Sequence, residues 1–245
     1  MLELANVPYV GSGVLASALC MDKTMAKQVI AAAGLPQPHF RAVHEPHFAD
    51  ADVDGIITSI GLPMFVKPAN MGSSVGVSKA KTVEALRDAL EVAFRYDEWA
   101  VVEESITGRE IEVAVLGNRR PKASVAGEII PGHEFYDYED KYLEDGAQLL
   151  IPAPLPTDKA DEVRALAVRC FEALRCDGLA RVDFFYEEST GRFLINEINT
   201  IPGFTPISMY PKLWMATGLT YAQLIDELVS LAVERHARRR RTTAR

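Results

Sequence analysis

The sequence predicts a mixed α+β fold with a domain boundary near residue 102. Runs rich in β-branched and aromatic residues recur from residue 39 onward, and LARVDFFY at 179–186 and RFLINEIN at 192–199 are the strongest strand patterns. The segment after Thr157 has apolar residues at the i, i+3, i+4, i+7 spacing of an amphipathic helix. With 245 residues and 48% apolar content, the chain can bury one large or two modest cores.

The N-terminal half is predicted from helix caps and strand patterns. Residues 1–20 lack a clear period and read as a strand end and a turn, so we interpret them as the remnant of a preceding domain or a linker. Asp22 is placed to cap a helix over about residues 23–33, which Gly34 closes. In the rest of this half we expect strands at 39–43, 63–68, 75–80, 100–104, 110–117 and 122–130, and helices at 49–60 and 83–95.

The C-terminal half begins with a long irregular connection, residues 131–156, whose length is typical of a lid or a binding loop. Thr157 is expected to cap the amphipathic helix, and the hairpin of the two strongest strands follows. A glycine–proline loop then leads to a last helix that begins at Thr220, with Gln223 completing a capping box. We therefore divide the chain into a linker at 1–20, a small domain at 21–102, a large domain at 103–235 and a basic, disordered tail at 236–245.

Composition and charge exclude several classes of protein. The net charge is −8, but residues 235–245 hold six arginines and no acid, which leaves 20 basic against 34 acidic residues in 1–234. So acidic a body argues against nucleic-acid binding. No stretch approaches the ~20 apolar residues that span a bilayer, and no basic segment of the kind that opens a signal peptide precedes the first helix. A reducing, cytoplasmic setting is favoured because three cysteines cannot all pair and form no ligand cluster; they are Cys20, Cys170 and Cys176.

Four polar residues on the C-terminal hairpin point to a metal site. A three-residue loop at 189–191 places Asp183 opposite Glu197. The same register places Arg181 opposite Asn199, and all four side chains share one face because strand residues alternate. Opposed side chains stand about 5 Å apart, so two carboxylates repel unless a cation lies between them. Such oxygen ligands suit magnesium, which keeps positions free for phosphates and water. The alternative is a surface hairpin with one ordinary salt bridge.

The segment KPANMGSSVGVSK, residues 67–79, joins a strand lysine to a glycine–serine turn. Successive backbone N–H groups in such a turn converge on an anion, and two hydroxyls and two lysines add donors. The segment is not a P-loop, because no Gly-Lys-Ser/Thr triplet follows the glycines. It matches the G-x-S-x-G motif of serine hydrolases through Gly72, Ser74 and Gly76, but a strand follows the turn where that motif requires a helix. A structural hairpin without a ligand is the other alternative.

Further polar residues suit a nucleotide but allow plainer interpretations. Glu103 and Glu104 end a predicted strand, and Glu110 follows after a turn, where carboxylates can accept from the amine and ribose hydroxyls of a nucleotide. A solvated acidic turn explains them equally well. Lys23 lies at a helix start, where the dipole favours anions, so a bound phosphate would account for its placement. GSGVLA at 11–16 fits the dinucleotide fingerprint only formally, because no complete βαβ unit surrounds it.

Taken together, these residues resemble the ATP-grasp family and, within it, the D-alanine–D-alanine ligases. The resemblance runs from about residue 7 to residue 233. It implies two α+β subdomains that clasp ATP between them, with two magnesium ions, or manganese in their place, as cofactors. The stretches that carry it are GSGVLASALCMDKTMAK, FVKPANMGSSVGVSK, VVEESITGREIEVAV, EFYDYEDKY, GLARVDFF and INEINTIPGFTPISMYPKL.

The resemblance also implies roles for single residues. Those implied to contact the nucleotide are Lys23, Lys67, Gly72, Ser74, Glu103, Ser105, Ile106, Glu110 and Lys141. Those implied to hold the metal ions are Asp183, Glu197 and Asn199. Those implied to act on the reacting groups are Ser73, Tyr142, Arg181, Gly203 and Ser208. The carboxylate of the second amino acid would be held by Ser208 and Met209. Two of these residues would belong to the lid, namely Lys141 and Tyr142.

The activity that the resemblance implies is ATP-dependent ligation of two D-alanines to D-alanyl-D-alanine through an acyl phosphate, for peptidoglycan synthesis in the cytoplasm. The tyrosine-rich EFYDYEDKY resembles the dipeptide-forming members. Members carry an N-terminal domain, and this chain starts where that domain should end. Two alternatives are another ATP-grasp carboxylate–amine ligase and a nucleotide-binding module without ligase activity. The implied partners are D-alanine, ATP and a second copy of the chain in a homodimer, with no membrane or nucleic acid.

Overall fold

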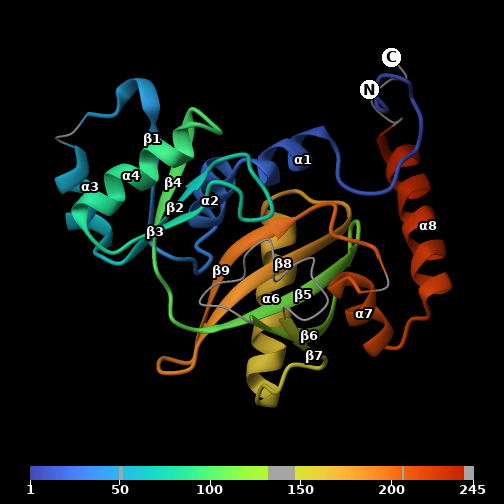
Figure 1. Cartoon of the computed structure of the whole chain (residues 1–245). Coiled ribbons are helices and arrows are strands. Elements are labelled where there is room, and N and C mark those ends of the chain that lie inside the picture. The colour runs from blue at the N-terminus through green and yellow to red at the C-terminus, as the bar shows by residue number, and fades with distance from the viewer. Residues whose placement is uncertain (50–51, 132–146, 206, 240–245) are drawn as a thin grey trace.

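The computed structural model describes residues 1–49, 52–131, 147–205 and 207–239. These residues form two antiparallel sheets with helices packed on them (Figure 1). Along the chain the elements are α1 (Val14–Met21), α2 (Lys23–Ala32), β1 (Phe40–His44), η1 (Glu45–His47), α3 (Asp52–Ile60), β2 (Met64–Pro68), β3 (Ser78–Ala80), α4 (Val83–Phe94), β4 (Trp99–Glu104), β5 (Arg109–Gly117), β6 (Lys122–Pro131), β7 (Ala147–Leu150), α6 (Thr157–Ala173), β8 (Gly178–Glu187), β9 (Arg192–Asn199), α7 (Met209–Ala216) and α8 (Tyr221–Arg239).

The smaller sheet has the strand order β1-β4-β2-β3. Strand β2 alternates buried and half-buried residues, β4 is buried from Ala100 to Glu103, and α3 and α4 cover the apolar face of the sheet. The Thr82 hydroxyl caps α4 by accepting from the Ala85 amide at 3.2 Å, as the sequence predicts. The side chains that form this core include Val53, Ile56, Met64, Val66, Leu86, Leu90 and Val102.

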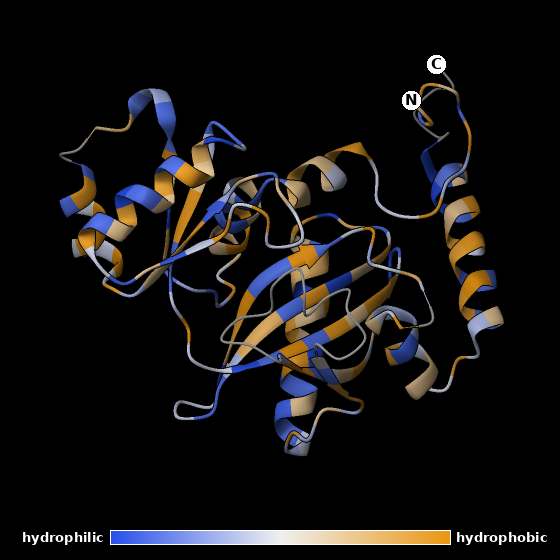
Figure 2. Ribbon diagram, in the orientation of Figure 1, coloured by the Kyte–Doolittle hydropathy of each residue, from blue (hydrophilic) through white to orange (hydrophobic). Residues whose placement is uncertain are grey.

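The larger sheet has the strand order β7-β6-β5-β8-β9, and α6 packs across one of its faces (Figure 1). The predicted amphipathic face of α6 is the face that is buried, where Phe171 and Leu174 meet Val113, Val182 and Ile195 of the sheet. Apolar and polar residues alternate along the strands, which is visible as orange and blue bands in Figure 2. The apolar half of this alternation therefore forms the main core.

The opposite face of the larger sheet is covered by helices at one end and faces a cavity at the other. Ala114, Leu116 and Leu179 lie under α7 and α8, which cover one end of this face. The residues that alternate in phase with them further along the same strands are polar, namely Glu110, Glu112, Arg181 and Asp183. These polar side chains cannot join the core, so this end of the sheet faces a cavity between the two sheets.

The described residues form four elements beyond those that the sequence pattern predicts: α1, η1, β7 and α7. The α1 sequence VLASALCM is apolar on all sides and has no helical period, and β7 is a four-residue strand at the sheet edge. The prediction that Thr157 caps its helix is wrong, because Pro156 occupies the N-cap position and Thr157 is the first helical residue. The predicted capping box of Thr220 and Gln223 is confirmed by reciprocal bonds of 2.9 and 3.2 Å.

The two sheets divide the chain differently from the predicted boundaries. The boundary near residue 102 falls inside β4, and the chain passes to the larger sheet only between Glu104 and Arg109. Ala26 and Ile30 of α2, predicted for the small domain, lie in the core of the larger sheet because their apolar face packs toward α6.

The prediction of a disordered tail from residue 236 is wrong for residues 236–239. Helix α8 continues to Arg239, where the guanidinium groups of Arg238 and Arg239 have carboxylate partners in Asp177 and Glu3. These ion pairs stabilise a segment that would otherwise be a run of like charges. Among the described helices, none combines the length and apolar character needed to cross a membrane.

Candidate functional site

Two adjoining cavities of about 590 and 560 Å³ lie over the larger sheet, the first between the two sheets and the second between the larger sheet and α2. Both are lined by Lys23, the glycine–serine turn, Arg181 and Glu197, so they form one continuous site. The predicted site residues that line the first cavity are Lys23, Lys67, Gly72, Ser73, Ser74, Ser105, Ile106, Glu110, Arg181, Asp183 and Glu197. Those that line the second cavity alone are Asn199, Gly203, Ser208 and Met209. The predicted lid residues lie outside the described residues, namely Lys141 and Tyr142.

The hairpin of β8 and β9 has the predicted register at the site. Asp183 is opposite Glu197 and Arg181 is opposite Asn199. The loop, however, is one residue longer than predicted, because the last strand pair joins residues 187 and 192. A bulge at Asn196 compensates by adding one residue to β9 between the site and the turn.

Arg181 holds the carboxylates of this site in place. Its Nε and Nη2 donate to the two oxygens of Asp183 at 2.7 and 2.8 Å, and the Glu112 carboxylate lies 3.0 Å from the same Nε. Glu112 sits opposite Asp183 on β5, and burial, together with the negative charges of Asp183 and Glu110, raises its pKa well above the ordinary value despite the nearby guanidinium. The carboxyl groups around Arg181 thus outnumber its single guanidinium.

This excess of carboxyl groups is what a bound divalent cation would offset. Asp183 and Glu197 supply carboxylates, and Asn199 adds an amide whose Nδ2 donates to Asp183 at 3.0 Å. Turning that amide over would present its oxygen to an ion between the strands. In the described part of the chain, no group of three or more acidic, histidine or cysteine residues has metal-binding geometry, and the set predicted from the sequence consists of two acids and an amide. This set fits magnesium, which takes few protein ligands.

Glu103 does not line the first cavity, where the resemblance to the ligases placed it. Its side chain is 2% exposed and lies between two lysines, with Lys27 at 2.8 Å and Lys67 in direct contact. Burial would raise the pKa of Glu103, but the two ammonium groups lower it to about 2. In the structure Glu103 therefore orients Lys67 and does not face the site.

Lys67 connects the two sheets across the cavity. It projects from β2 of the smaller sheet, and its Nζ donates to the Oδ1 of Asn196 on β9 at 3.3 Å. Burial lowers the pKa of Lys67, but Glu103 and the acids of the site outweigh that effect, so Lys67 carries its charge in the cavity. Asn196 reaches this position because the β9 bulge turns it toward the cavity together with Glu197.

The glycine–serine turn has the backbone of a strained loop. Ser73 and Ser74 both have left-handed φ values, 53° and 59°, which non-glycine residues rarely adopt. Gly76 follows with φ 72°, and a Cβ there would lie 2.7 Å from Pro68, so only glycine fits. Lys23 approaches the turn from the start of α2 and donates to the Met71 carbonyl. The turn therefore presents its backbone and Lys23 toward the same space.

The loop after β9 forms the wall of the second cavity. The Ser208 hydroxyl is 3.0 Å from the Thr205 amide, which donates to it, and Ser208 starts α7. A Cβ on Gly203 would lie 2.8 Å from that hydroxyl, so glycine allows the two residues to approach. Met209, the first residue of α7, is buried and lines the cavity beside Ser208.

Sequence reasoning missed three residues of this site: Lys27, Glu112 and Asn196. The signal for Glu112 was available, since it alternates with Glu110 in an otherwise apolar strand. Lys27 shares a face of α2 with Lys23, four residues earlier, which also could have been noticed. Nothing in the sequence marks the bulge that turns Asn196.

This sequence and fold match known ligases. The sequence model of the family described as "D-ala D-ala ligase C-terminus" matches residues 29–230. The chain belongs to this family. It is 52% identical over 238 residues to the D-alanine–D-alanine ligase of Thermoanaerobacter sp. (strain X514), which covers 96% of this chain and 66% of that relative. It is 51% identical over 244 residues to that of Solibacter usitatus, covering 99% and 74%.

Two solved structures share the two-sheet ATP-grasp architecture. The D-alanine–D-alanine ligase from Coxiella burnetii has a TM-score of 0.88 at 40% identity, covering 99% of this chain and 65% of that one. The VanG D-Ala:D-Ser ligase from Enterococcus faecalis has a TM-score of 0.86 at 37% identity, covering 94% and 66%. This member of the D-alanine–D-alanine ligase family thus spans about two thirds of the length of the first curated relatives that it matches.

Proposed function

We propose that this protein ligates two D-alanines to D-alanyl-D-alanine at the expense of ATP, in the cytoplasm, for peptidoglycan synthesis. The observation that carries the proposal is the set of Asp183, Glu197 and Asn199 beside Arg181, in a cavity that Lys67 enters from the other sheet. This set combines ligands for a divalent cation with positive groups for phosphates, which phosphoryl transfer to a carboxylate requires. The names of relatives 52% identical to the chain support the same reaction.

In this proposal the nucleotide lies in the first cavity. Its phosphates contact Lys23 and Lys67, and the turn of Gly72, Ser73 and Ser74 closes over the transferred phosphoryl group with its backbone amides. Magnesium, held by the acids and the amide of the hairpin, supplies neutralisation of the charge on that group. Ser105, Ile106 and Glu110 contact the adenosine, because they line the same cavity beyond the lysines.

The first D-alanine carboxylate receives the phosphoryl group and becomes an acyl phosphate, which the amine of the second D-alanine attacks. Arg181 and the amide of Gly203 stabilise the oxyanion that develops in this step. Ser208 and Met209 bind the carboxylate of the second D-alanine at the wall of the second cavity. Water must be excluded, and we assign this role to the segment that carries Lys141 and Tyr142.

A second candidate is a ligase of the same mechanism with a different second substrate. The observation that favours it is the match to the VanG D-Ala:D-Ser ligase, whose fold differs little from that of the D-alanine–D-alanine ligase. A third is a nucleotide-binding module without turnover, for which the lysines and acids of the first cavity would suffice. These candidates share the nucleotide site and differ in the steps after nucleotide binding.

The test is phosphate release from MgATP with D-alanine, D-serine or D-lactate as the second substrate. Phosphate release with D-alanine as the second substrate supports the proposal. Release that occurs only when D-serine or D-lactate is the second substrate moves the assignment to the second candidate. ATP-dependent thermal stabilisation without release by any amino acid supports the third. The variant Glu197→Gln should lose release while its thermal midpoint is kept. Its matched control is Glu187→Gln, which changes a carboxylate at the turn of the same hairpin, paired with Arg192 at 2.9 Å, and should leave the rate unchanged.

A further inference from the structure

Two cysteines far apart in the sequence meet at the edge of the second cavity. The Sγ of Cys20, at the end of α1, lies 3.7 Å from the Sγ of Cys176, which precedes β8. Both are free thiols in the structure. The third cysteine, Cys170, is fully buried inside α6.

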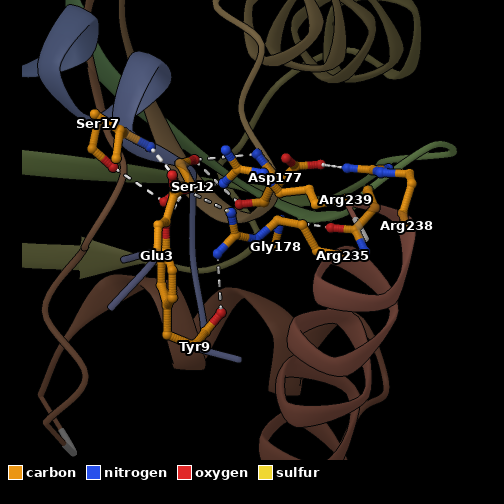
Figure 3. Close-up of polar contacts among 11 residues, drawn as sticks. Glu3, Tyr9, Ser12, Ser17, Asp177, Gly178, Arg235, Arg238 and Arg239 are labelled. Carbon is orange, nitrogen blue, oxygen red and sulfur yellow. Dashed lines mark hydrogen bonds and ion pairs between the residues drawn. The ribbon is translucent and has the colours of Figure 1, made fainter. Parts of the chain in front are cut away.

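Hydrogen bonds fix the two segments that carry these thiols. The Ser12 hydroxyl donates to the Asp177 carbonyl at 3.2 Å, and the Asp177 amide donates back to it at 3.1 Å (Figure 3). Ser17 of α1 donates to the Ser12 carbonyl at 3.2 Å, which ties the helix to the same point. Gly178 allows the close approach, because a Cβ there would lie 3.0 Å from the Gly11 nitrogen. These contacts between the two segments therefore place the two sulfur atoms next to each other.

Helix α8 adds a second set of contacts over the same segments. We call this set the clasp; it consists of Arg235, Arg238 and Arg239 with their partners Tyr9, Asp177 and Glu3. Arg238 donates to the Asp177 carboxylate at 2.6 Å, next to Cys176. Arg235 is 3% exposed and lies 4.1 Å above the Tyr9 ring, and Glu3 pairs with Arg239 (Figure 3). The N-terminal segment is thus held against the loop before β8 from both sides, so the two sulfurs stay within reach of one another.

The two thiols differ in access. Cys20 is half-buried and lines the second cavity, whereas Cys176 is 5% exposed. The hydrogen bond with Cys20, followed by burial, raises the pKa of Cys176. An oxidant that enters the cavity therefore meets Cys20 first, with Cys176 behind it as the resolving thiol.

We propose that Cys20 and Cys176 form an oxidation-sensitive dithiol at the wall of the substrate cavity. The Cys20 thiolate attacks one oxygen of hydrogen peroxide, the O–O bond breaks, and Cys20 becomes a sulfenic acid while hydroxide leaves. The Cys176 thiol then attacks the Cys20 sulfur, the S–O bond breaks, and water leaves as the disulfide forms. Two thiols lose two electrons in total, and the peroxide is reduced to water.

The geometric demand of the second step is small. A disulfide requires the sulfurs to be about 2.05 Å apart, so they must approach by roughly 1.7 Å from their present 3.7 Å. The disulfide would draw the Cys20 sulfur out of the cavity and close a chain loop of 156 residues. Oxidation then protects Cys20 from irreversible sulfinic acid formation, and a dithiol reductant restores both thiols. This chemistry does not depend on which substrates occupy the cavity.

The sequence makes the test unambiguous, because trypsin places each cysteine in its own peptide. Cleavage after Lys23, Arg169, Arg175 and Arg181 gives peptides 1–23, 170–175 and 176–181. The full chain is treated with equimolar hydrogen peroxide, alkylated, digested without reductant and mapped by mass spectrometry. We expect peptides 1–23 and 176–181 to be joined, and titration of the intact protein to find one remaining thiol, with recovery of three after dithiothreitol.

Variants assign the order of events. Cys170→Ser should form the same cross-link, and Cys176→Ser should accumulate a Cys20 sulfenic acid that a cyclic 1,3-diketone probe labels. Cys20→Ser should keep both remaining thiols at the same peroxide dose. A cross-link that includes peptide 170–175, or conversion of Cys20 to sulfinic acid in the unaltered chain without any cross-link, would overturn the proposal. The mapping of the unaltered chain needs no variant, so a variant that fails to fold does not remove the test.

Discussion

The buried carboxylate of Glu103 offers the sharpest prediction about stability. Glu103 is held between Lys27 and Lys67, and replacing it by glutamine keeps the shape of the side chain while removing its charge. A carboxyl whose pKa falls from 4.5 to about 2 contributes about 3 kcal/mol to folding at neutral pH, since one pH unit corresponds to about 1.4 kcal/mol. Two buried lysines that lose their carboxylate partner place the loss in a range of about 3–5 kcal/mol.

The pH dependence of this loss follows from the direction of the pKa change. A carboxyl with a lowered pKa in the folded state stabilises the protein above its unfolded pKa of 4.5, and the contribution disappears as the pH falls through about 2. The difference in unfolding free energy between the unaltered chain and Glu103→Gln should therefore be full at pH 7. It should be about half as large near pH 3.

Urea denaturation at both pH values measures this difference. The matched control is Glu104→Gln, on the next residue of β4, where a half-buried carboxylate accepts from the His39 amide at 2.9 Å. The control should lose about 1 kcal/mol or less, because glutamine keeps the acceptor oxygen. A Glu103→Gln loss as small as that of the control, or one equal at pH 7 and pH 3, would refute the reasoning.

Two further predictions concern the strained turn and the clasp. Gly76→Ala should lower the unfolding free energy by about 1–3 kcal/mol, because the positive φ of Gly76 and its contact with Pro68 leave no room for a Cβ. The control Gly72→Ala adds a Cβ that meets no atom within 4 Å and should cost about 1 kcal/mol or less. Urea denaturation compares the two variants, and equal losses would contradict the claim that the turn is strained at Gly76. Arg235→Ala should lower the unfolding free energy by about 2–3 kcal/mol, since the buried guanidinium covers the Tyr9 ring. It should also speed amide hydrogen exchange in residues 2–13. Unchanged exchange would show that the clasp does not hold this segment.

The helix caps and strand patterns predict most of the fold, because they are local. Asp22 caps α2 by accepting from the Thr24 and Met25 amides, and Thr82 caps α4, as the sequence indicates. Elements without a local signal escape prediction. Helix α1 has no polar face that would give it a helical pattern, and the neighbours it packs against, α2 and β9, are supplied only by the tertiary structure.

The hairpin shows how a correct prediction can rest on an incomplete reason. Strict alternation along β9 would place Glu197 on the same side as Phe193 and Ile195, which are in the core. The bulge at Asn196 changes the phase, so that Ile198 joins the core and Glu197 faces the cavity. A longer turn and a bulge cancel in the register, and neither leaves a clear trace in the sequence.

The sequence also does not reveal ion pairs between residues that are far apart along the chain. The basic C-terminal segment reads as a solvated run of arginines, because nothing local reveals that Glu3 and Asp177 lie beside it. Glu103 likewise reads as a nucleotide contact, and only the packing of α2 against β4 shows that Lys27 reaches it. Pairwise electrostatics between distant segments requires the fold to be known first.

The central claim is that acids of neighbouring strands hold a divalent cation beside the nucleotide phosphates. Its most direct test is a crystal structure with a non-hydrolysable ATP analogue and Mn²⁺, in which anomalous scattering locates the ion. We expect an ion about 2.1 Å from oxygens of Asp183, Glu197 and Asn199, with the Asn199 amide turned over from its present orientation. A bound nucleotide whose only ion lies away from these three side chains, with Arg181 still paired to Asp183 as it is now, would contradict the account.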